Sequence, residues 1–268
     1  MQGDLSFTVS GTNGGRIVSF KCAGQEILLS EKDHPLYYGA TLWPSPQRRF
    51  WPPSPILDAE PYFAEVEGNL LRLISEKDSL KGFRFTKEFS FSKKDKAISI
   101  NYTIENISDT TQHVAAWDVT RVPGGVTFFP VKDKYLKDLP SNLDHVSEQD
   151  GIIRYNYSQD SIKRGQKLFA TTQEGWLAHQ YKDLVLVKQF PMTQVKDLPL
   201  LQGEVEIFLA PNSQYVELEN HGKYTELRKG ESLHYQQKWF LFQVGKDEMQ
   251  NQSKIIDTIR RRLHILTK

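Results

Sequence analysis

A chain of 268 residues that is 38% hydrophobic and 12% aromatic is long enough to bury a substantial core. Its 34 basic and 33 acidic residues nearly cancel, so we expect no nucleic-acid partner. A single cysteine, Cys22, excludes an intramolecular disulfide and a cysteine-based metal cluster. No apolar run reaches membrane-spanning length, so we expect no membrane span.

The first thirty residues read as short strands joined by turns. Apolar residues alternate with polar ones over residues 5–9 and again over residues 18–22. Gly24-Gln25 is typical of a hairpin turn into a further strand over residues 26–29. The glycines of residues 11–15 are also compatible with a phosphate-binding loop, but no helical pattern follows them, so we interpret them as a turn.

Residues 34–62 differ in kind, with seven prolines among many aromatic side chains. Proline density argues against a strand ladder, and the aromatic content is too high for a disordered linker, so we predict a long ordered loop. Trp43 and Trp51 offer flat rings for stacking on a sugar, and Arg48, Arg49 and Asp58 can bind hydroxyls or a carboxylate. The alternative is a lid that packs on the fold for structural reasons alone.

Residues 70–104 alternate like successive antiparallel strands, and residues 113–125 continue the pattern. On a regular strand, His113, Trp117 and Arg121 share one face, and Asp118 faces the other way. Small alanines beside Trp117 leave space for a ring to lie flat against the indole. The alternative is a core tryptophan with a surface arginine.

Residues 176–191 predict two further strands, and Lys188 follows the apolar pattern of the second. Lys188 then either meets a sugar oxygen or an anion, or simply solvates the end of the strand. Residues 247–266 have apolar residues at helical spacing and predict one amphipathic helix on the outside of a sheet. The three arginines at 260–262 are interpreted as a solvated face of that helix.

The stretch over residues 214–230 predicts a strand that ends in a loop and a tight turn. Alternation places Val216 and Leu218 on one face and Glu217 and Glu219 on the other, with His221 next in line. If that face is enclosed, burial and like charge would raise the pKa of at least one carboxyl and make it a usable acid or base. The alternative is a solvent-facing strand with two solvated glutamates.

About fifteen strands, one terminal helix and no internal repeat predict an all-β fold, a large antiparallel sandwich forming a single domain over residues 1–268. The sequence contains no HxxxH or HExxH pattern, nucleophile elbow or P-loop. We therefore expect no metal and no cofactor, although a few loop carboxylates could hold calcium without a readable motif. What remains is acid–base chemistry by carboxylate and histidine, or no chemistry.

Three stretches in order, GGRIVSFKCAGQEIL, ENISDTTQHVAAWDVT and VELENHGKYTELRKGES, resemble the galactose mutarotase-like (aldose 1-epimerase-like) superfamily. The chain is similar in particular to a bacterial domain-of-unknown-function branch with a WPSPQ…WPP…LD…PY loop and a W-[DE]-V-T strand. The resemblance implies a β-supersandwich that binds a sugar on its concave face. It implies a glutamate base at Glu217 or Glu219 and a substrate-binding arginine at Arg48 or Arg49.

One departure from the family pattern concerns the acid. Aldose epimerases have a histidine about two residues beyond the position of Trp117-Asp118, where this sequence has Val119-Thr120. The proton donor to the ring oxygen would then be His113, His179 or a protonated Asp118, opposite the glutamate base.

Two main hypotheses follow, an isomerase of the mutarotase type and a non-catalytic carbohydrate-binding protein; a structural module is a third. In either of the first two the partner is a mono- or oligosaccharide, and we expect a monomer or a weak dimer. The compartment is periplasmic or secreted if a signal peptide was removed, and cytoplasmic otherwise. The substrate-binding residues would be Trp43, Arg48, Arg49, Trp51, Asp58, Trp117, Arg121, His179, Lys188 and His221.

Overall fold

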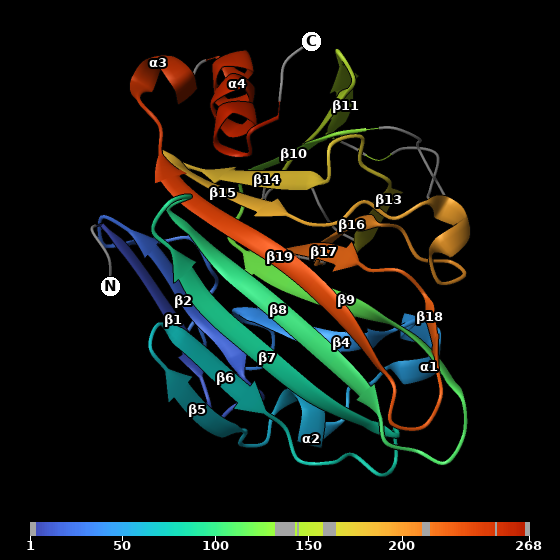
Figure 1. Ribbon diagram of the computed structural model, residues 1–268. Coiled ribbons are helices and arrows are strands. Elements are labelled where there is room, and N and C mark those ends of the chain that lie inside the picture. Colours follow the sequence, from blue (N-terminus) through green and yellow to red (C-terminus); the bar gives the residue numbers. More distant parts are fainter. Residues whose placement is uncertain are drawn as a thin grey trace.

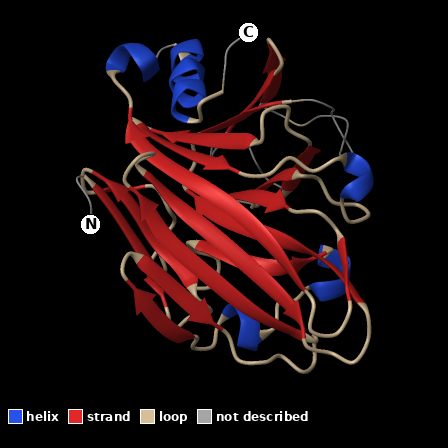
Figure 2. Cartoon of the chain, viewed as in Figure 1, coloured by secondary structure: helices blue, strands red, loops and turns tan. Residues whose placement is uncertain are grey.

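The structure, a computed structural model, describes residues 4–131, 143, 145–157, 165–210, 215–249 and 251–265. Within these residues the chain forms two large antiparallel β-sheets that pack on one another, with a short helix near the C-terminal end (Figures 1 and 2). This arrangement confirms the large antiparallel β-sandwich that the alternating sequence predicts. None of the helices in the described residues has the length and apolar character needed to cross a membrane.

The first sheet has the strand order β1-β2-β4-β9-β17-β16-β13, with β3 paired to β2 and β18 paired to β9. Its strands are β1 (Leu5–Ser10), β2 (Arg16–Cys22), β3 (Gln25–Glu26), β4 (Ala40–Ser45), β9 (Gln112–Val122), β13 (Gln166–Ala170), β16 (Val205–Leu209), β17 (Val216–His221) and β18 (Thr225–Leu227). The two central strands, β9 and β17, are far apart in sequence and lie side by side.

The second sheet has the order β11-β12-β10-β14-β15-β19-β8-β7-β6-β5. Its strands are β5 (Phe63–Glu67), β6 (Leu70–Ile74), β7 (Phe83–Ser92), β8 (Ala97–Asn106), β10 (Val126–Pro130), β11 (Val146–Gln149), β12 (Ile152–Asn156), β14 (Trp176–Tyr181), β15 (Leu184–Gln189) and β19 (Ser232–Gln243). Strands β7, β8 and β19 run side by side across the face of the molecule in Figure 1.

The main hydrophobic core lies between the two sheets. Alternate residues of β7 and β8, among them Phe83, Phe85 and Ile100, are fully buried there and meet Val216 and Leu218 from β17. Each such side chain contributes roughly 1.5–3 kcal/mol when it leaves water. The predicted alternation of the late strand is therefore correct: its apolar face is the core face.

The proline-rich segment is more regular than predicted. Residues Ala40–Ser45 form β4, a strand that contains Pro44 and pairs with β9 along its length. The prediction of a loop was wrong for this strand. Proline is tolerated in it because β4 pairs with β2 only at Ile17↔Ala40, away from Pro44. At Pro44 the strand has one neighbour in the described residues, so the missing proline N–H removes no bond from a second ladder. Two short helices follow, α1 (Gln47–Phe50) and α2 (Pro55–Asp58).

The C-terminal segment forms two helices in place of the single one predicted, α3 (Lys246–Met249) and α4 (Gln252–Arg262). The break lies at Asn251, whose side chain accepts a hydrogen bond from the backbone N–H of Ser253 and caps α4. Ile255, Ile256 and Ile259 of α4 pack on the outer side of the second sheet, as the helical spacing predicts. A short 3-10 helix, η1 (Val195–Asp197), precedes β16.

A buried ion pair joins the two sheets. The Lys188 ammonium on β15 contacts the Asp118 carboxylate on β9, and both side chains are completely buried. The Tyr102 hydroxyl donates to the same carboxylate at 3.1 Å. Burial lowers the pKa of Lys188, against the opposing effect of Asp118. Of the two alternatives for Lys188, solvation of a strand end was wrong, because β15 is paired with β19 through this position and the side chain is fully buried.

Removing one partner of this pair should destabilise the fold strongly. Lys188→Met leaves the Asp118 carboxylate buried without its cation, which typically costs about 3–5 kcal/mol of unfolding free energy. Urea denaturation measures the loss. The matched control is Lys238→Met, whose partner Asp95 lies near the surface and whose own side chain is 45% exposed, with an expected loss of about 0–1 kcal/mol. Equal losses in the two variants would contradict a structural role for the buried pair.

Candidate functional site

A cavity of about 380 Å³ opens on the face of the first sheet that points away from the second sheet. Strand β17 contributes Glu217 and Glu219 to it, and the neighbouring β9 contributes Trp117. Further lining residues are Tyr37, Trp43, Gln47, Trp51, Gln166, Lys167, Phe208 and Tyr215. The same alternation that buries Val216 and Leu218 in the core therefore places both glutamates in this cavity.

Three tryptophans form one wall of the cavity. The ring centres of Trp43 and Trp51 are 5.0 Å apart, those of Trp43 and Trp117 are 5.1 Å apart, and those of Trp51 and Trp117 are 6.3 Å apart. Trp51 follows α1 and is 40% exposed, which leaves part of its ring open to solvent. Trp43 is held in place because its indole N–H donates to Asp58 at 2.6 Å. Asp58 in turn pairs with Arg16 at 3.3 Å.

Glu219 lies at the floor of the cavity and is 1% exposed. Its carboxylate accepts the indole N–H of Trp117 at 2.6 Å and pairs with the Lys167 ammonium at 2.9 Å. Burial raises the pKa of Glu219 to about 8, and the nearby charges of Glu206 and Glu217 add to this rise while Lys167 opposes it. The raised pKa favours the protonated carboxyl, which is the form that can donate a proton.

Lys167 on β13 links Glu219 to a second buried carboxylate, that of Glu206 on β16, at 2.6 Å. Burial alone would lower the pKa of Lys167, but Glu219 and Glu206 together raise it above its usual value. Burial alone would likewise raise the pKa of Glu206, but His221 and Lys167 lower it to about 2. The Lys167 ammonium thus lies between two carboxyl groups whose pKa values shift in opposite directions, that of Glu206 downward and that of Glu219 upward.

The polar network continues to His221, which stacks on Trp117. The Nε2 atom of His221 is 3.3 Å from the Glu206 carboxylate, and its Nδ1 atom is 3.0 Å from the Ser45 hydroxyl. The His221 ring also stacks on Trp117, with ring centres 5.5 Å apart and planes 17° from parallel. His221 is fully buried on the same face of β17 as Glu217 and Glu219, where it lies opposite Trp117 in the sheet and packs on its ring.

Glu217 has a separate partner. The Arg121 guanidinium donates its Nε–H to Glu217 at 2.9 Å and an Nη1–H to the Thr41 hydroxyl at 3.1 Å. Arg121 is fully buried and lies over the Trp43 ring at 5.0 Å. Arg121 therefore orients Glu217 and packs against the tryptophan wall rather than facing the cavity itself.

Three of these residues also form a candidate metal site. Ligand atoms of Glu206, Glu219 and His221 lie within 4.8 Å of one another, and two carboxylates with one imidazole suit a zinc or similar ion. The Lys167 ammonium already lies 2.6 and 2.9 Å from the two carboxylates and supplies them with a cationic partner. The resident cation of this cluster is therefore a lysine.

Several predicted site residues lie elsewhere. Asp118 and Lys188 are between the sheets, and His179 is buried in the second sheet beside the Thr127 hydroxyl at 2.9 Å. His113 is exposed and lies 3.1 Å from Glu226. Arg48 and Arg49 are exposed on α1, where Arg49 donates to the Gln112 side chain at 2.6 Å. The structure thus brings together Trp43, Trp51, Trp117, Glu217 and Glu219, with Arg121, Asp58 and His221 behind them.

Two residues of this network, Lys167 and Glu206, were missed by the sequence reasoning. Lys167 lies in a stretch with weak periodicity that offered no strand signal. Glu206 did carry a signal, because it stands among the apolar residues Val205, Ile207, Phe208 and Leu209. A charged side chain among apolar residues either faces solvent or has a buried partner. The partner of Glu206 is Lys167 on the neighbouring strand β13.

A family model described as "Domain of unknown function (DUF4380)" matches residues 43–242. No curated protein matches the chain. Among solved structures, a putative aldose 1-epimerase from Escherichia coli K12 has a TM-score of 0.62 at 13% identity, covering 90% of this chain and 97% of that one. A galactose mutarotase related enzyme from Lactobacillus acidophilus has a TM-score of 0.63 at 12% identity, covering 92% and 97%.

A TPR-domain containing protein from Parabacteroides distasonis ATCC 8503 is also similar, with a TM-score of 0.65 at 15% identity. The match covers 90% of this chain and 46% of that protein, so the chain spans about half of its length. At these identities the likeness shows the fold. It confirms the fold that the resemblance of the sequence motifs to galactose mutarotase-like proteins implies.

The raised pKa of Glu219 predicts a specific pH dependence of stability. A pKa near 8 in the folded protein, above the usual 4.5, means that folding favours the protonated carboxyl. This contribution is full below about pH 4.5 and is lost as the pH rises through about 8. The unfolding free energy of the protein minus that of Glu219→Gln should therefore fall between about pH 5 and about pH 9.

Urea denaturation at several pH values measures this difference. The control is Glu67→Gln, because Glu67 is exposed on the edge strand β5 and should give a flat difference. A difference for Glu219→Gln that rises with pH would mean that the folded state prefers the charged carboxylate, which contradicts a proton held on Glu219 at neutral pH.

Proposed function

The chain belongs to the family described as domain of unknown function DUF4380, and we propose that it binds a sugar in the tryptophan-walled cavity and moves protons at the anomeric centre, as a mutarotase does. The observation that carries this proposal is the position of Glu219, a buried carboxyl on the floor of an open cavity, where burial raises its pKa and favours the protonated form. A second carboxylate, Glu217, stands two residues away on the same strand face.

The lining of the cavity suits a carbohydrate. Flat indole rings stack on the apolar faces of sugar rings, and Trp51 leaves such a face open. Carboxylates and the amides of Gln47 and Gln166 supply hydrogen-bond partners for hydroxyls. A volume of about 380 Å³ is near the lower end of small-molecule pockets, which favours a monosaccharide or the end of a longer chain.

The two carboxyl groups can divide the proton transfers between them. Glu217, ion-paired to Arg121, takes the proton from the anomeric hydroxyl while Glu219 donates its proton to the ring oxygen. The bond between the anomeric carbon and the ring oxygen breaks, and the open aldehyde forms. Rotation of that aldehyde and the reverse transfers close the ring on the other face. Successive same-face positions on a strand are about 6–7 Å apart, so the two groups can reach both oxygens of one ring.

The fold neighbours support the same class of ligand. Two of the similar structures bear the names putative aldose 1-epimerase and galactose mutarotase related enzyme. Because one fold hosts many functions, this support concerns the kind of ligand, and the acid–base role rests on the cavity itself.

A specific observation favours a second candidate, a non-catalytic sugar-binding protein. The Glu219 carboxylate is engaged by both Trp117 and Lys167, and Glu217 by Arg121. Carboxylates held so firmly can serve as hydrogen-bond acceptors for bound hydroxyls without moving a proton. Binding without accelerated anomer exchange would identify this role.

The experiment is NMR of the protein with a panel of free hexoses, pentoses and uronic acids, followed for binding and for anomer exchange. We expect one sugar class to bind and its anomers to exchange faster with protein present. Loss of a positioned proton-transfer group typically costs roughly 10²–10⁴ in rate, so Glu219→Gln and Glu217→Gln should each lower exchange by that much. Because glutamine keeps the shape of glutamate, binding should persist in at least one of them.

Glu67→Gln is the control and should exchange anomers like the unmodified protein, since Glu67 lies on the far sheet. Accelerated exchange that survives in both cavity variants would place the chemistry elsewhere and contradict the roles of Glu217 and Glu219. Absence of binding across the whole panel would contradict the sugar site itself.

A further inference from the structure

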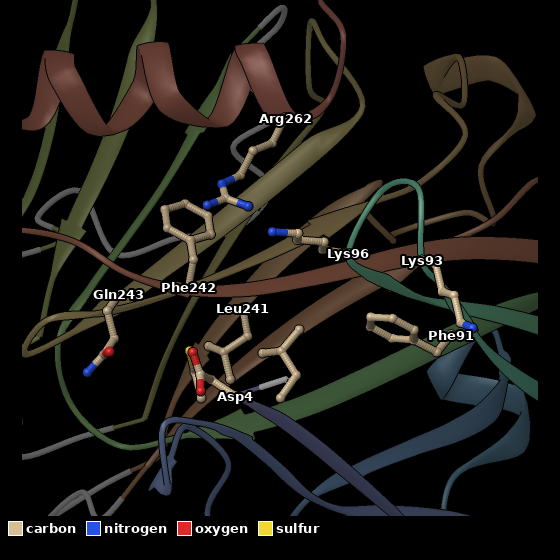
Figure 3. Close-up of a pocket in the computed structure, with 10 residues that line it drawn as sticks. Asp4, Phe91, Lys93, Lys96, Leu241, Phe242, Gln243 and Arg262 are labelled. Carbon is tan, nitrogen blue, oxygen red and sulfur yellow. The ribbon is translucent and has the colours of Figure 1, made fainter. Parts of the chain in front are cut away.

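A second cavity, of about 560 Å³, opens at the end of the sandwich where β1 begins and β19 ends (Figure 3). Its lining comes from five parts of the chain: β1 with the residue before it, the end of β2, the β7–β8 turn, the end of β19 and the last turn of α4. It shares no lining residue with the tryptophan-walled cavity on β9 and β17. A function for it is therefore independent of the sugar site.

The charges around this opening are unbalanced. Lys93, Lys96 and Arg262 line it, against the single carboxylate of Asp4. Figure 3 shows the Lys96 and Arg262 side chains projecting into the opening, with Asp4 on its other side. A cavity with three cations and one anion attracts a negatively charged group.

Arg262 is the most informative of these residues. Of the three consecutive arginines at the end of α4, Arg260 pairs with Glu174 at 2.7 Å and Arg261 donates to the Thr258 hydroxyl at 2.9 Å. Arg262 instead lies over the Phe242 ring at 4.3 Å, and its Nε atom is buried with no acceptor in the described residues. A solvated helix face was the expectation for all three, and Arg262 departs from it because α4 packs this side chain onto β19.

The floor of the cavity is apolar. Leu241 and Phe242 are 3% and 5% exposed, and Leu5 and Phe91 complete the floor. Leu5 and Phe91 also line an adjoining groove of about 310 Å³ between β1 and the strands β6 and β7. Most of its lining is apolar, including Phe7, Val9 and Leu71. A cationic opening therefore adjoins an apolar groove.

We propose that this cavity binds an amphipathic anion, a carboxylate with a medium-length alkyl chain, with the carboxylate between Arg262 and Lys96 and the chain along the groove beside β1. The guanidinium gives the carboxylate a charge-assisted hydrogen bond and satisfies the buried Nε–H. The alkyl chain covers half-buried apolar side chains of β1 and β7, so that each added methylene strengthens binding. The two features together select a ligand that has both a charge and an apolar tail.

The test is calorimetric titration of the whole protein with sodium decanoate, with decanol and butyrate as comparison ligands. We expect saturable binding of decanoate, with decanol and butyrate each bound at least about tenfold more weakly, because one lacks the charge and the other the chain. Arg262→Gln should weaken decanoate binding by about tenfold or more, and Lys96→Gln should weaken it by a smaller factor.

Arg261→Gln is the matched control, since Arg261 is an exposed neighbour on the same helix turn and should leave the affinity unchanged. Lys96 lies in an exposed turn, so its variant tests the proposal even if Arg262→Gln fails to fold. Equal affinity for decanoate and decanol, an equal loss in Arg261→Gln, or no saturable binding of decanoate would each overturn the proposal.

Discussion

The pairing of β9 with β17 is the constraint on which both the core and the candidate site depend. The register places Glu217 opposite Arg121 and Asn220 opposite Asp118. On one face of this pair Asp118 meets Lys188 between the sheets, and on the other Trp117 and Glu219 form the cavity floor. Because side chains alternate strictly along a strand, a shift of one residue would send every one of these groups to the wrong face. The buried charges therefore specify the register as firmly as the apolar residues do.

Beneath the cavity, charge is distributed so that one carboxyl stays neutral. Lys167 lies between Glu206 and Glu219, and Glu206 has additional partners in His221, Gln202 and the backbone N–H of Gly203. Glu206, which has more charged and hydrogen-bonding partners, keeps its charge, and the pKa of Glu219 is raised toward the protonated form. Two titratable groups whose surroundings push their pKa values apart are the usual basis of an acid–base site. This is a physical reason to assign proton donation to Glu219 rather than to the more accessible Glu217.

Much of this arrangement could be predicted from the sequence, and the failures concern contacts between distant strands. The alternation in residues 214–230 predicted both the buried face and the pair Glu217 and Glu219, because a strand in a sandwich has one apolar side. The rings of Trp43 and Trp51 in residues 34–62 were predicted to stack on a sugar, and both line the cavity, although Trp43 lies on strand β4 and not in a loop. These features depend on local pattern alone.

What the sequence could not show was which residues of distant strands meet. Lys188 was predicted to meet a sugar oxygen or an anion, or to solvate a strand end, and its partner is the carboxylate of Asp118, about seventy residues away and on the other sheet. His113 and His179 were candidate acids, yet one points to solvent and the other into the second sheet. Lys167, which sets the charge balance of the site, has its partners on β16 and β17, and only the strand order reveals that neighbourhood.

The most direct test of proton donation by Glu219 is the titration of that carboxyl itself. Carbon-13 NMR of protein labelled at glutamate side chains follows each carboxyl with pH, and Glu219→Gln identifies the resonance by its loss. We expect a midpoint for Glu219 near 8, so that the group is a proton donor at neutral pH. A midpoint at or below the usual 4.5 would mean that Glu219 is a charged carboxylate held by Lys167, and would contradict its assignment as the acid.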